Sequence, residues 1–213
     1  MKRFLSLSAL IMLVLIFSGC ATLDKARLAD KLSEENRRLK LMLKDAESKE
    51  EEISDLERAK RELARKLEKE IGEYKAKLEM TERGLVITFL AEVFFDSGKD
   101  EIKKQGESTL KEVASVLNED VPDSYVAIEG HTDSDPIKYS NWKSNWELSS
   151  ARALSVLHYF IDSCSVEPSR LSANGYGEYR PVAPNDTPKG KQQNRRVEIV
   201  ILPSSIKKVK GEF

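Results

Sequence analysis

The first third of the chain contains almost no residue that breaks a helix. No proline occurs before Pro122, and no glycine lies between Gly19 and Gly72. Along this stretch apolar residues recur at spacings of three, four and seven, which is the pattern of a coiled-coil seam. We therefore predict one continuous helix over residues 24–83, which would reach about 90 Å at 1.5 Å per residue. The seam consists of Leu28, Leu32, Leu39, Met42, Ala46, Ile53, Leu56, Leu63, Leu67 and Tyr74.

Charged residues leave two interpretations of this helix. Residues 24–83 contain 17 basic and 17 acidic residues, and some of them fall on the seam and weaken it. The charged seam positions are Glu35, Lys49, Lys60 and Glu70. One interpretation is a parallel coiled coil formed by self-association, and the other is a single helix held by i,i+4 ion pairs such as Glu62–Lys66. The spacing does not set the number of strands in a coiled coil.

The N-terminus has the layout of a secretory signal. Lys2 and Arg3 precede an apolar run from Phe4 to Phe17 that only two serines interrupt. This run is too short for an ordinary membrane-spanning helix and has the length of a signal-peptide core. We predict a signal peptide over residues 1–19, and the alternative is an N-terminal anchor that is not cleaved.

The end of this run, Phe17-Ser18-Gly19-Cys20, resembles a bacterial lipobox. The resemblance implies cleavage before Cys20 and attachment of diacylglycerol to its sulfur, which makes residues 20–23 a lipidated N-terminus. Two or more acyl chains, such as palmitate, anchor a protein stably. Ala21 follows the cysteine where an aspartate would resemble an inner-membrane retention signal, so we expect an outer-membrane anchor and a periplasmic domain. Cys164 is then without a partner in the chain, and we predict a small, partly buried residue at a helix end.

After the charged stretch the apolar pattern becomes that of a compact α/β domain. The predicted strands are 85–95, 125–130, 171–175 and 196–202, and the predicted helices are 101–118 and 144–162. The strands alternate apolar and polar residues, and the second helix opens with a Ser144–Glu147 capping box. We therefore predict a two-layer α/β sandwich over residues 84–203, with a β-α-β-α-β-β mixed sheet and helices on one face.

The segment between the last two predicted strands is too long for a hairpin turn. Residues 177–194 contain three prolines and form a loop of a length that often lines a functional site. We therefore expect this loop to border the site of the domain. The basic tail over residues 204–213 is predicted to be flexible.

The candidate site begins where the second predicted strand ends, at Gly130-His131-Thr132-Asp133. The next helix presents Asn145, Ser149 and Arg152 at positions i, i+4 and i+7, which places them in one polar row. A carboxylate can bind an ammonium group and an arginine can bind a carboxylate in a planar fork, so this set suits a small zwitterionic ligand. The structural alternative is an ordinary salt bridge between Asp133 and Arg152.

Other chemistries lack the residues that they need. No activated nucleophile, paired catalytic carboxylates or zinc set is evident, so we predict a binding protein without enzymatic activity or a cofactor. The domain contains 13 basic and 18 acidic residues, which offers nucleic acid no basic surface. His131, Asp133 and Asp135 alternate along an extended segment that a proline follows, and this makes a poor metal site. Trp142 and Trp146 could stack on a sugar, although packing within the domain is the more common role.

Five blocks of sequence in the domain carry a family resemblance. In order, they are Val93-Phe94-Phe95-Asp96-Ser97-Gly98, Glu129-Gly130-His131-Thr132-Asp133, Asn145-Trp146-Glu147-Leu148-Ser149-Ser150-Ala151-Arg152-Ala153, Gly175-Tyr176-Gly177-Glu178 with Pro181 and Asn185, and Asn194-Arg195-Arg196-Val197-Glu198-Ile199. Together they resemble the C-terminal domain of the OmpA family, which includes the peptidoglycan-associated lipoprotein and the flagellar stator protein MotB. The match covers residues 85–202.

The resemblance implies that the domain binds peptidoglycan non-covalently through the diaminopimelate of its stem peptide. Carried over residue by residue, the implied ligand contacts are Asp133, Arg152, Thr132, Asn145, Asn194 and Arg195. For the last two, a structural role in holding the long loop remains open. The chain departs from the family at Lys191, where an arginine is usual, and an ammonium is a point charge without the planar fork. Residues 134–143 form a longer stretch than in the shortest members and resemble the stator version.

These features predict an outer-membrane lipoprotein that tethers the envelope to the cell wall. The lipid on Cys20 would hold the membrane, the helix would act as a spacer, and the domain would bind peptidoglycan. One alternative is a stator-like anchor of the inner membrane, which needs a membrane helix with a protonatable carboxylate, and residues 4–19 contain no acidic residue. Another alternative is a scaffold whose coiled coil recruits further envelope proteins. Self-association through residues 24–83 would make the chain a homo-oligomer.

Overall fold

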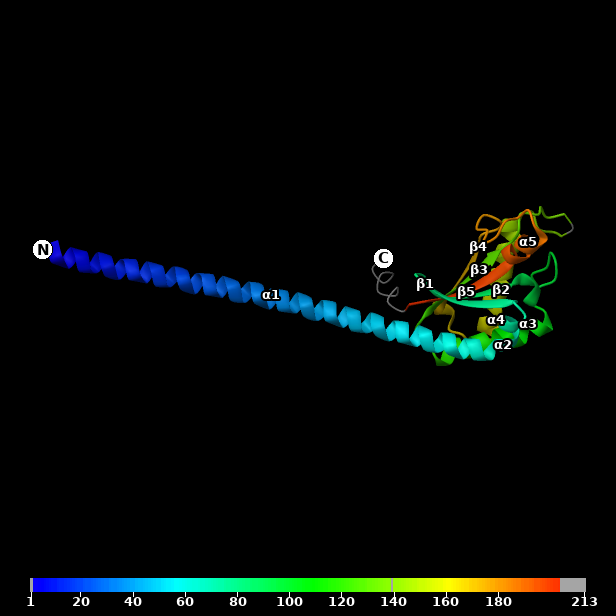
Figure 1. Cartoon of the computed structure of the whole chain (residues 1–213), viewed down its shortest axis with the longest axis horizontal. Helices are drawn as coiled ribbons and strands as arrows, with labels where there is room; N and C mark the ends of the chain where they lie inside the picture. The colour runs from blue at the N-terminus through cyan, green and yellow to red at the C-terminus, as the bar shows by residue number, and fades with distance from the viewer. Residues whose placement is uncertain (1, 139, 204–213) are drawn as a thin grey trace. The chain divides into compact units, whose positions relative to one another are not determined.

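The computed structural model of the chain describes residues 2–138 and 140–203, with side chains from residue 25 onward except that of residue 26. Internal contacts divide the chain into two units, at the step from Glu50 to Glu51 (Figure 1). The predicted signal peptide and Cys20 lie where no side chain is described. The predicted flexible tail over residues 204–213 lies outside the described residues.

The first unit belongs to helix α1 (Lys2–Lys66), and the predicted long N-terminal helix is thereby confirmed. Its seam is open to solvent, because Leu28, Leu32, Leu39 and Met42 keep 51% to 58% of their surface exposed. Such a stripe is the surface that a coiled-coil partner would cover. The predicted self-association stays a prediction.

No helix within the described residues is both long enough and apolar enough to cross a membrane.

The last turns of α1 belong to the second unit and form part of its core. Leu56, Ala59 and Leu63 are at most 2% exposed, and Leu67, just beyond the helix, is equally buried. The same seam is therefore exposed as far as Ile53 and is covered by the domain at Leu56, Leu63 and Leu67. A short helix, α2 (Glu68–Gly72), follows and ends the helical part of the segment.

Strand β1 (Ala76–Thr81) corrects the predicted helix, which we expected to continue to residue 83. Its apolar residues pack toward the core while Lys77 and Glu79 are exposed, which is the period of two of a strand. β1 pairs along its whole length with β2 (Gly84–Leu90) in an antiparallel hairpin. The backbone pairing and the burial of alternate side chains outweigh the helix propensity of the charged residues between them.

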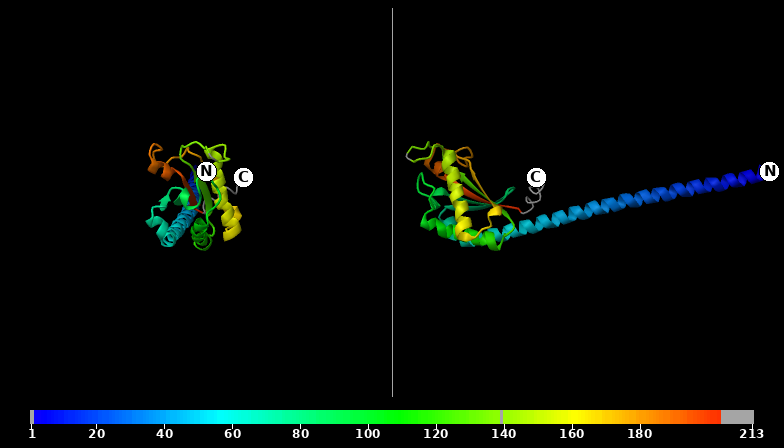
Figure 2. Two further views of the ribbon diagram at one scale, coloured as in Figure 1. Left: turned by 90° about the vertical axis from the view of Figure 1, so that its right-hand side faces the viewer. Right: turned by 180° about the vertical axis from the view of Figure 1, so that it is seen from behind.

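The strands form one mixed sheet of five in the order β1-β2-β5-β3-β4. Figure 2 shows the domain from two further sides. β3 (Tyr125–His131) and β4 (Leu171–Gly175) are parallel to each other. β5 (Arg196–Leu202) lies between β2 and β3 and is antiparallel to both. The predicted mixed α/β sheet is confirmed, with β1 as an additional strand at its edge.

Helices α3 (Lys104–Glu119) and α4 (Asn145–Cys164) pack with the end of α1 on one face of the sheet. This layer encloses the core, as the predicted sandwich with helices on one face requires. Cys164 ends α4 and is half-buried, as predicted, and burial raises the pKa of its thiol. The largest fully buried side chains are Phe89, Phe94, Phe160, Leu63, Leu67, Leu85, Ile87, Leu110, Leu117, Ile128, Ile199 and Ile201.

The first predicted strand, residues 85–95, ends earlier than expected, because β2 stops at Leu90. A 3-10 helix, η1 (Ala91–Val93), turns the chain inward, and the backbone N–H groups of Phe94 and Phe95 both donate to the carbonyl of Ala91. Both rings are then buried and tilted against each other, with centroids 6.1 Å apart. Apolar alternation continues through this turn in the sequence, which is why it resembled a longer strand.

The predicted loop over residues 177–194 contains a helix that we did not expect, α5 (Pro188–Asn194). Thr187 caps it by accepting a hydrogen bond from the N–H of Gly190 at 3.0 Å, and proline stands at its first turn. The predicted cap of α4 is present, since the hydroxyl of Ser144 accepts from the N–H of Glu147 at 3.4 Å. A further 3-10 helix, η2 (Pro168–Arg170), precedes β4.

Two glycines let α4 pack directly against the sheet. A Cβ atom at Gly130 would lie 2.0 Å from the carbonyl oxygen of Ser149, and one at Gly175 would lie 2.1 Å from the hydroxyl oxygen of Ser150. Both neighbours belong to α4, so the missing side chains set the distance between helix and strands. The polar row at the start of α4 is placed over the strand ends by this contact.

We expect Gly130→Ala to lower the free energy of unfolding by about 1–3 kcal/mol, since α4 must move away from β3 to admit the methyl group. Urea denaturation followed by circular dichroism measures the change. Gly72→Ala is the matched control, because a Cβ atom there meets nothing within 4 Å. Equal unfolding midpoints for the two variants would contradict the close contact.

Candidate ligand-binding site

The candidate site lies at one end of the sheet, where three distant segments meet. Arg196 at the start of β5 is opposite Leu90 at the end of β2 and opposite His131 at the end of β3. The residues that follow β2 and β3 therefore meet the residue that precedes β5, and together with the start of α4 they surround a pocket of about 600 Å³. The predicted site residues that line it are Thr132, Asp133, Asn145, Arg152 and Arg195.

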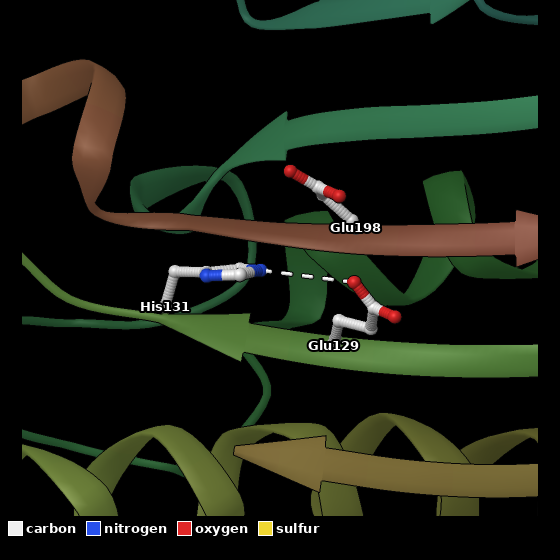
Figure 3. A group of neighbouring side chains, drawn as sticks. All are labelled: Glu129, His131 and Glu198. Atoms are coloured by element: carbon white, nitrogen blue, oxygen red, sulfur yellow. Dashed lines mark ion pairs between the residues drawn. The ribbon is translucent and has the colours of Figure 1, made fainter. Parts of the chain in front are cut away.

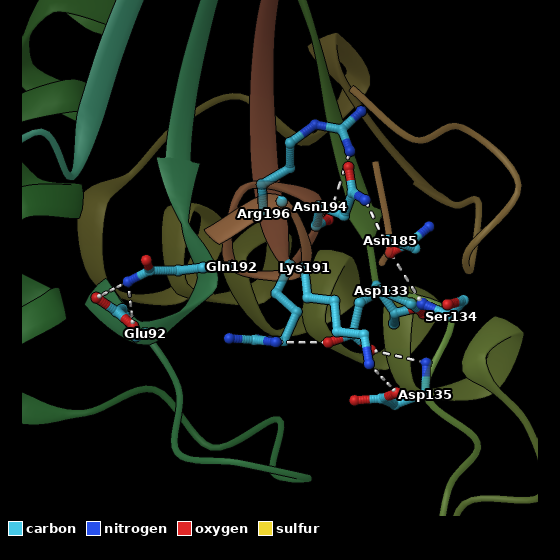
Figure 4. A network of polar contacts seen from close by, with 12 residues as sticks. Glu92, Asp133, Ser134, Asp135, Asn185, Lys191, Gln192, Asn194 and Arg196 are labelled. Carbon is cyan, nitrogen blue, oxygen red and sulfur yellow. Dashed lines mark hydrogen bonds and ion pairs between the residues drawn. The ribbon is translucent and has the colours of Figure 1, made fainter. Parts of the chain in front are cut away.

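Asp133 is a buried carboxylate, 6% exposed, that already has a partner. Its Oδ2 accepts a hydrogen bond from Nη1 of Arg195 at 2.5 Å, and its Oδ1 accepts one from the backbone N–H of Asp135 at 3.1 Å (Figure 4). The structural alternative from the sequence, a salt bridge between Asp133 and Arg152, is not formed. Asp133 pairs with Arg195 instead, and this leaves Arg152 without that carboxylate as a partner.

Arg152 is a buried cation, 5% exposed, held by backbone carbonyls. Its Nε donates to the carbonyl of Lys99 at 2.9 Å, and its Nη2 donates to that of Asp96 at 3.1 Å. Its guanidinium carbon also lies 5.2 Å from the ring centroid of Phe95. Among the described residues no carboxylate comes within salt-bridge distance of it. Burial and the nearby charge of Arg195 lower the pKa of Arg152 to about 10, so it remains charged at neutral pH.

Asn145 and Thr132 tie the walls of the pocket together. The side-chain amide of Asn145 donates to the carbonyl of Asp135 at 3.0 Å and to Oε2 of Glu178 at 2.6 Å. Thr132 donates its hydroxyl to the carbonyl of Asp133 at 2.9 Å, and its N–H donates to the long loop. Both residues line the pocket, but much of their hydrogen bonding is used within the chain. Glu178 belongs to one of the five blocks that resemble the family. Nothing in the sequence indicated that its carboxylate would contact Asn145.

Ser149, the middle residue of the predicted polar row, is fully buried and does not line the pocket. Its hydroxyl accepts a hydrogen bond from the N–H of Gly177 at 2.9 Å and donates one to the carbonyl of Trp146 at 3.0 Å. It therefore fixes the long loop on the first turns of α4. In the polar row, Asn145 and Arg152 therefore line the pocket, and Ser149 between them has a structural role.

Asn194 and Arg195 are neighbours in the sequence but have different surroundings. Arg195 reaches Asp133, whereas Asn194 is fully buried in the long loop. Its Oδ1 accepts from the N–H groups of Val182 and Ala183 at 2.8 and 3.0 Å, and its Nδ2 donates to Oδ1 of Asn185 at 2.8 Å. These contacts favour the structural role in the loop that the sequence left open for Asn194.

One ion pair lies at the edge of the pocket, where Asp135 is a lining residue. Nζ of Lys191 pairs with Oδ1 of Asp135 at 2.7 Å, and this hydrogen bond lowers the pKa of the aspartate (Figure 4). Trp142, on the stretch before α4, donates its indole N–H to the carbonyl of Gly98 at 2.9 Å and is half-buried. Trp142 is therefore attached to the loop that follows η1.

The ring of His131 lies on the other face of the sheet and not in the pocket. Figure 3 shows it pointing along the sheet toward Glu129 and Glu198, and the three side chains place ligand atoms within 4.8 Å of one another. Arg83 pairs with both carboxylates at 2.9 Å, and Arg196 pairs with Glu198 at 2.7 Å. The two arginines already balance the two glutamates, so a divalent cation would leave the cluster strongly positive, and we assign no metal to it.

His131 in this cluster is 1% exposed, and neither of its ring nitrogens has a hydrogen-bond partner. Its ring stacks on that of Tyr176, with centroids 5.3 Å apart. Burial and the charge of Arg196 lower the pKa of His131 to about 3. The imidazole is therefore neutral in the folded protein over the whole physiological range.

Comparison with known proteins gives the same family as the sequence blocks. Residues 94–195 match the OmpA family. Motility protein B of Bacillus subtilis is 40% identical over 149 residues, which are 70% of this chain and 57% of that protein. The chain thus spans less than two thirds of the length of this curated relative.

Two solved structures illustrate the likeness in fold. The cell wall anchor of the T6SS from Pseudomonas aeruginosa superposes with a TM-score of 0.60 and 30% identity, over 66% of this chain and 96% of that chain. A MotB-like protein from Desulfovibrio vulgaris gives a TM-score of 0.65 and 27% identity, over 72% of this chain and 98% of that chain. The predicted resemblance is confirmed, and the chain carries a domain of the OmpA family with MotB-type relatives.

Proposed function

We propose that this chain anchors the cell envelope by binding peptidoglycan non-covalently, through the diaminopimelate of the stem peptide. The observation that carries the proposal is the state of Arg152, a buried cation that lines an open pocket and has no carboxylate partner among the described residues. A buried charge without a counter-charge is costly, and a carboxylate ligand would supply the missing partner. The same pocket contains the carboxylate of Asp133 for a positive group.

Diaminopimelate fits this pair because its free end carries an ammonium and a carboxylate on one carbon atom. The carboxylate would accept hydrogen bonds from Arg152, and the ammonium would donate to Asp133, which would share its charge with Arg195. Because the carbonyls of Asp96 and Lys99 already hold the guanidinium, little side-chain freedom is lost when the ligand arrives. The pocket is thus preorganised for a zwitterion.

The relatives support a role at the cell wall. One structural neighbour is described as the cell wall anchor of a T6SS, and motility proteins match in both sequence and structure. These descriptions belong to those proteins, and for this chain they support wall binding as the activity of the shared domain. No catalytic chemistry is needed for such a role, and we propose none.

For the membrane end we propose a lipid anchor in the outer membrane through Cys20, with the domain in the periplasm. The lipobox-like sequence supports this location, and the exposed seam of α1 supports self-association of the spacer. The match to motility protein B favours a second candidate, a stator-like anchor of the inner membrane. The absence of an acidic residue from residues 4–19 argues against a proton-conducting helix there.

Sedimentation with isolated cell walls tests the binding activity. We expect the purified chain to sediment with diaminopimelate-type sacculi and to be released by free meso-diaminopimelate. Cadaverine is the matched competitor, since it has the same two amines on the same carbon chain and lacks both carboxylates, and we expect it to release little protein. A chain that stays in the supernatant, or that cadaverine releases equally well, would refute the proposal.

Mass spectrometry tests the anchor. In membranes separated on a density gradient, we expect the chain in the outer-membrane fraction, with its first residue an acylated Cys20. The control is Cys20→Ser, which cannot form the thioether and should not mature to the lipidated form. Recovery of a chain that begins at Met1 in the inner membrane would instead support the stator-like candidate.

A further inference from the structure

We propose that Trp146 and Tyr179 form a platform that binds a sugar ring of the glycan strand, beside the pocket for the stem peptide. The proposal rests on the proposed function and names a second part of the same ligand. Sugars present flat C–H faces that pack on aromatic rings, and peptidoglycan carries its peptides on a chain of sugars. A domain that holds the peptide therefore has the glycan strand within reach.

The platform is connected to the pocket through the residues that precede its two rings, although neither ring lines the pocket itself. Trp146 follows Asn145, which lines the pocket, and Tyr179 follows Glu178. The amide of Asn145 donates to the carboxylate of Glu178 at 2.6 Å. One hydrogen bond therefore links the two residues that directly precede the aromatic pair. The loop also packs closely here, because a Cβ atom at Gly177 would lie 3.4 Å from the backbone nitrogen of Trp146.

The two rings are stacked and yet remain open to solvent. Their centroids are 5.1 Å apart with an angle of 22° between the planes. Trp146 is 47% exposed and Tyr179 is 64% exposed, although each covers part of the other. Aromatic surface of this size is usually buried or used in binding. Its charge-free character suits an uncharged sugar better than the charged stem peptide.

The loop holds the platform in place before any ligand is bound. Tyr176 stacks on His131, and the guanidinium carbon of Arg180 lies 3.6 Å from the ring centroid of Tyr176. The carbonyl of Arg180 accepts a hydrogen bond from Nη2 of Arg196 at 3.1 Å. Tyr179 is thus fixed by its neighbours on both sides, and binding costs little conformational entropy.

The sequence suggested a different pairing, between Trp142 and Trp146 at helical spacing. The structure separates their roles, since Trp142 lies before α4 and donates its indole N–H to Gly98. The ring that stacks on Trp146 comes from the long loop, far along the chain. Only Trp146 of the two tryptophans has the exposure that a sugar platform needs.

Two probes separate the platform from the pocket. One is a disaccharide-tripeptide that contains diaminopimelate, and the other is the same tripeptide without sugar. We expect the wild-type chain to bind the disaccharide form more tightly. Trp146→Ala and Tyr179→Ala should weaken binding of the disaccharide form about three- to tenfold and leave the affinity for the bare tripeptide unchanged. Isothermal titration calorimetry measures both affinities.

Tyr74→Ala is the control, since this tyrosine is 90% exposed and lies outside the pocket lining. It should change neither affinity. Equal binding of both probes by the wild-type chain overturns the platform and leaves the proposed function intact. Equal losses for both probes in Trp146→Ala and Tyr179→Ala also overturn the platform, because they indicate a disturbed pocket. A wild-type chain that binds neither probe overturns the proposed function, and the platform with it.

Discussion

Replacing Arg152 with alanine is expected to abolish binding of diaminopimelate-type peptidoglycan. The variant would leave the ligand carboxylate in a buried pocket without a counter-charge, and such a loss typically costs about 2–5 kcal/mol. This corresponds to an affinity roughly 30- to 5,000-fold lower, which removes a micromolar complex from the range of a sedimentation assay. Asp133→Ala should be similar in direction, because it leaves the ligand ammonium facing Arg195 without the intervening carboxylate.

A conservative change and a matched control define the test. Arg152→Lys keeps the charge, but an ammonium cannot form the planar fork while also reaching the carbonyls of Asp96 and Lys99, so we expect weakened binding. Arg170→Ala is the control, since Arg170 also donates to backbone carbonyls, those of Ser124 and Val121, at 2.8 and 2.7 Å but outside the pocket. Calorimetry with the tripeptide measures affinity, and thermal melts show that each variant is folded.

A folded Arg152→Ala variant that binds like the wild type would place the ligand elsewhere. If Arg170→Ala weakened binding as much as Arg152→Ala, the losses would reflect general destabilisation. The contrast between the two arginines therefore separates a ligand contact from a structural one.

The second large effect is expected in acid. His131 is buried and neutral, with a pKa near 3 in the folded chain against about 6.5 in the unfolded chain. Below pH 6.5 the unfolded chain therefore binds a proton that the folded chain does not, and stability falls as the pH falls. The slope approaches about 1.4 kcal/mol per pH unit once the unfolded histidine is fully protonated, so the loss between pH 6.5 and 4.5 is about 2 kcal/mol.

His131→Phe should remove this loss, because phenylalanine keeps the stacking on Tyr176 and has no proton to take up. Urea denaturation at pH 7.0, 6.0, 5.0 and 4.5 gives the slope for each protein. Lower pH values are left out because Glu198 also takes up a proton in acid. Burial of Glu198 raises its pKa, but the hydrogen bond and charge of Arg196 outweigh that effect and lower the pKa overall. Parallel pH profiles for the wild type and His131→Phe would show that the folded protein accommodates the charged ring.

Much of the domain could be predicted from the sequence because its strands and helices bury one face each. The alternation in β3, β4 and β5 and the capped start of α4 are strong local signals. β1 was missed because its period of two, between Lys77 and Glu79, lies at the end of a charged helix and covers six residues. Pairing with β2 stabilises this short segment as a strand, and that pairing cannot be seen in the sequence alone.

The site was harder to predict than the fold. The pocket contains five of the six expected residues, but their partners differ from those that charge suggested. Arg152 is held by backbone carbonyls, which every residue has and which leave no mark in a sequence. Asn194 stands next to Arg195 in the same block, and the direction of each side chain depends on the loop that folds over it.

The α1 seam is divided into an exposed part and a buried part, and this division determines where the length of the helix can change without destabilising the domain. From Leu56 to Leu67 the apolar seam residues belong to the core, whereas Leu28 to Ile53 lies outside it. Removing seven residues from the outer part would shorten the reach by about 10 Å and preserve the heptad phase. The same deletion after Leu56 would pull Leu63 and Leu67 from the core. The length of the outer part can therefore vary without loss of core packing, whereas the last turns of α1 are fixed by their contacts in the domain.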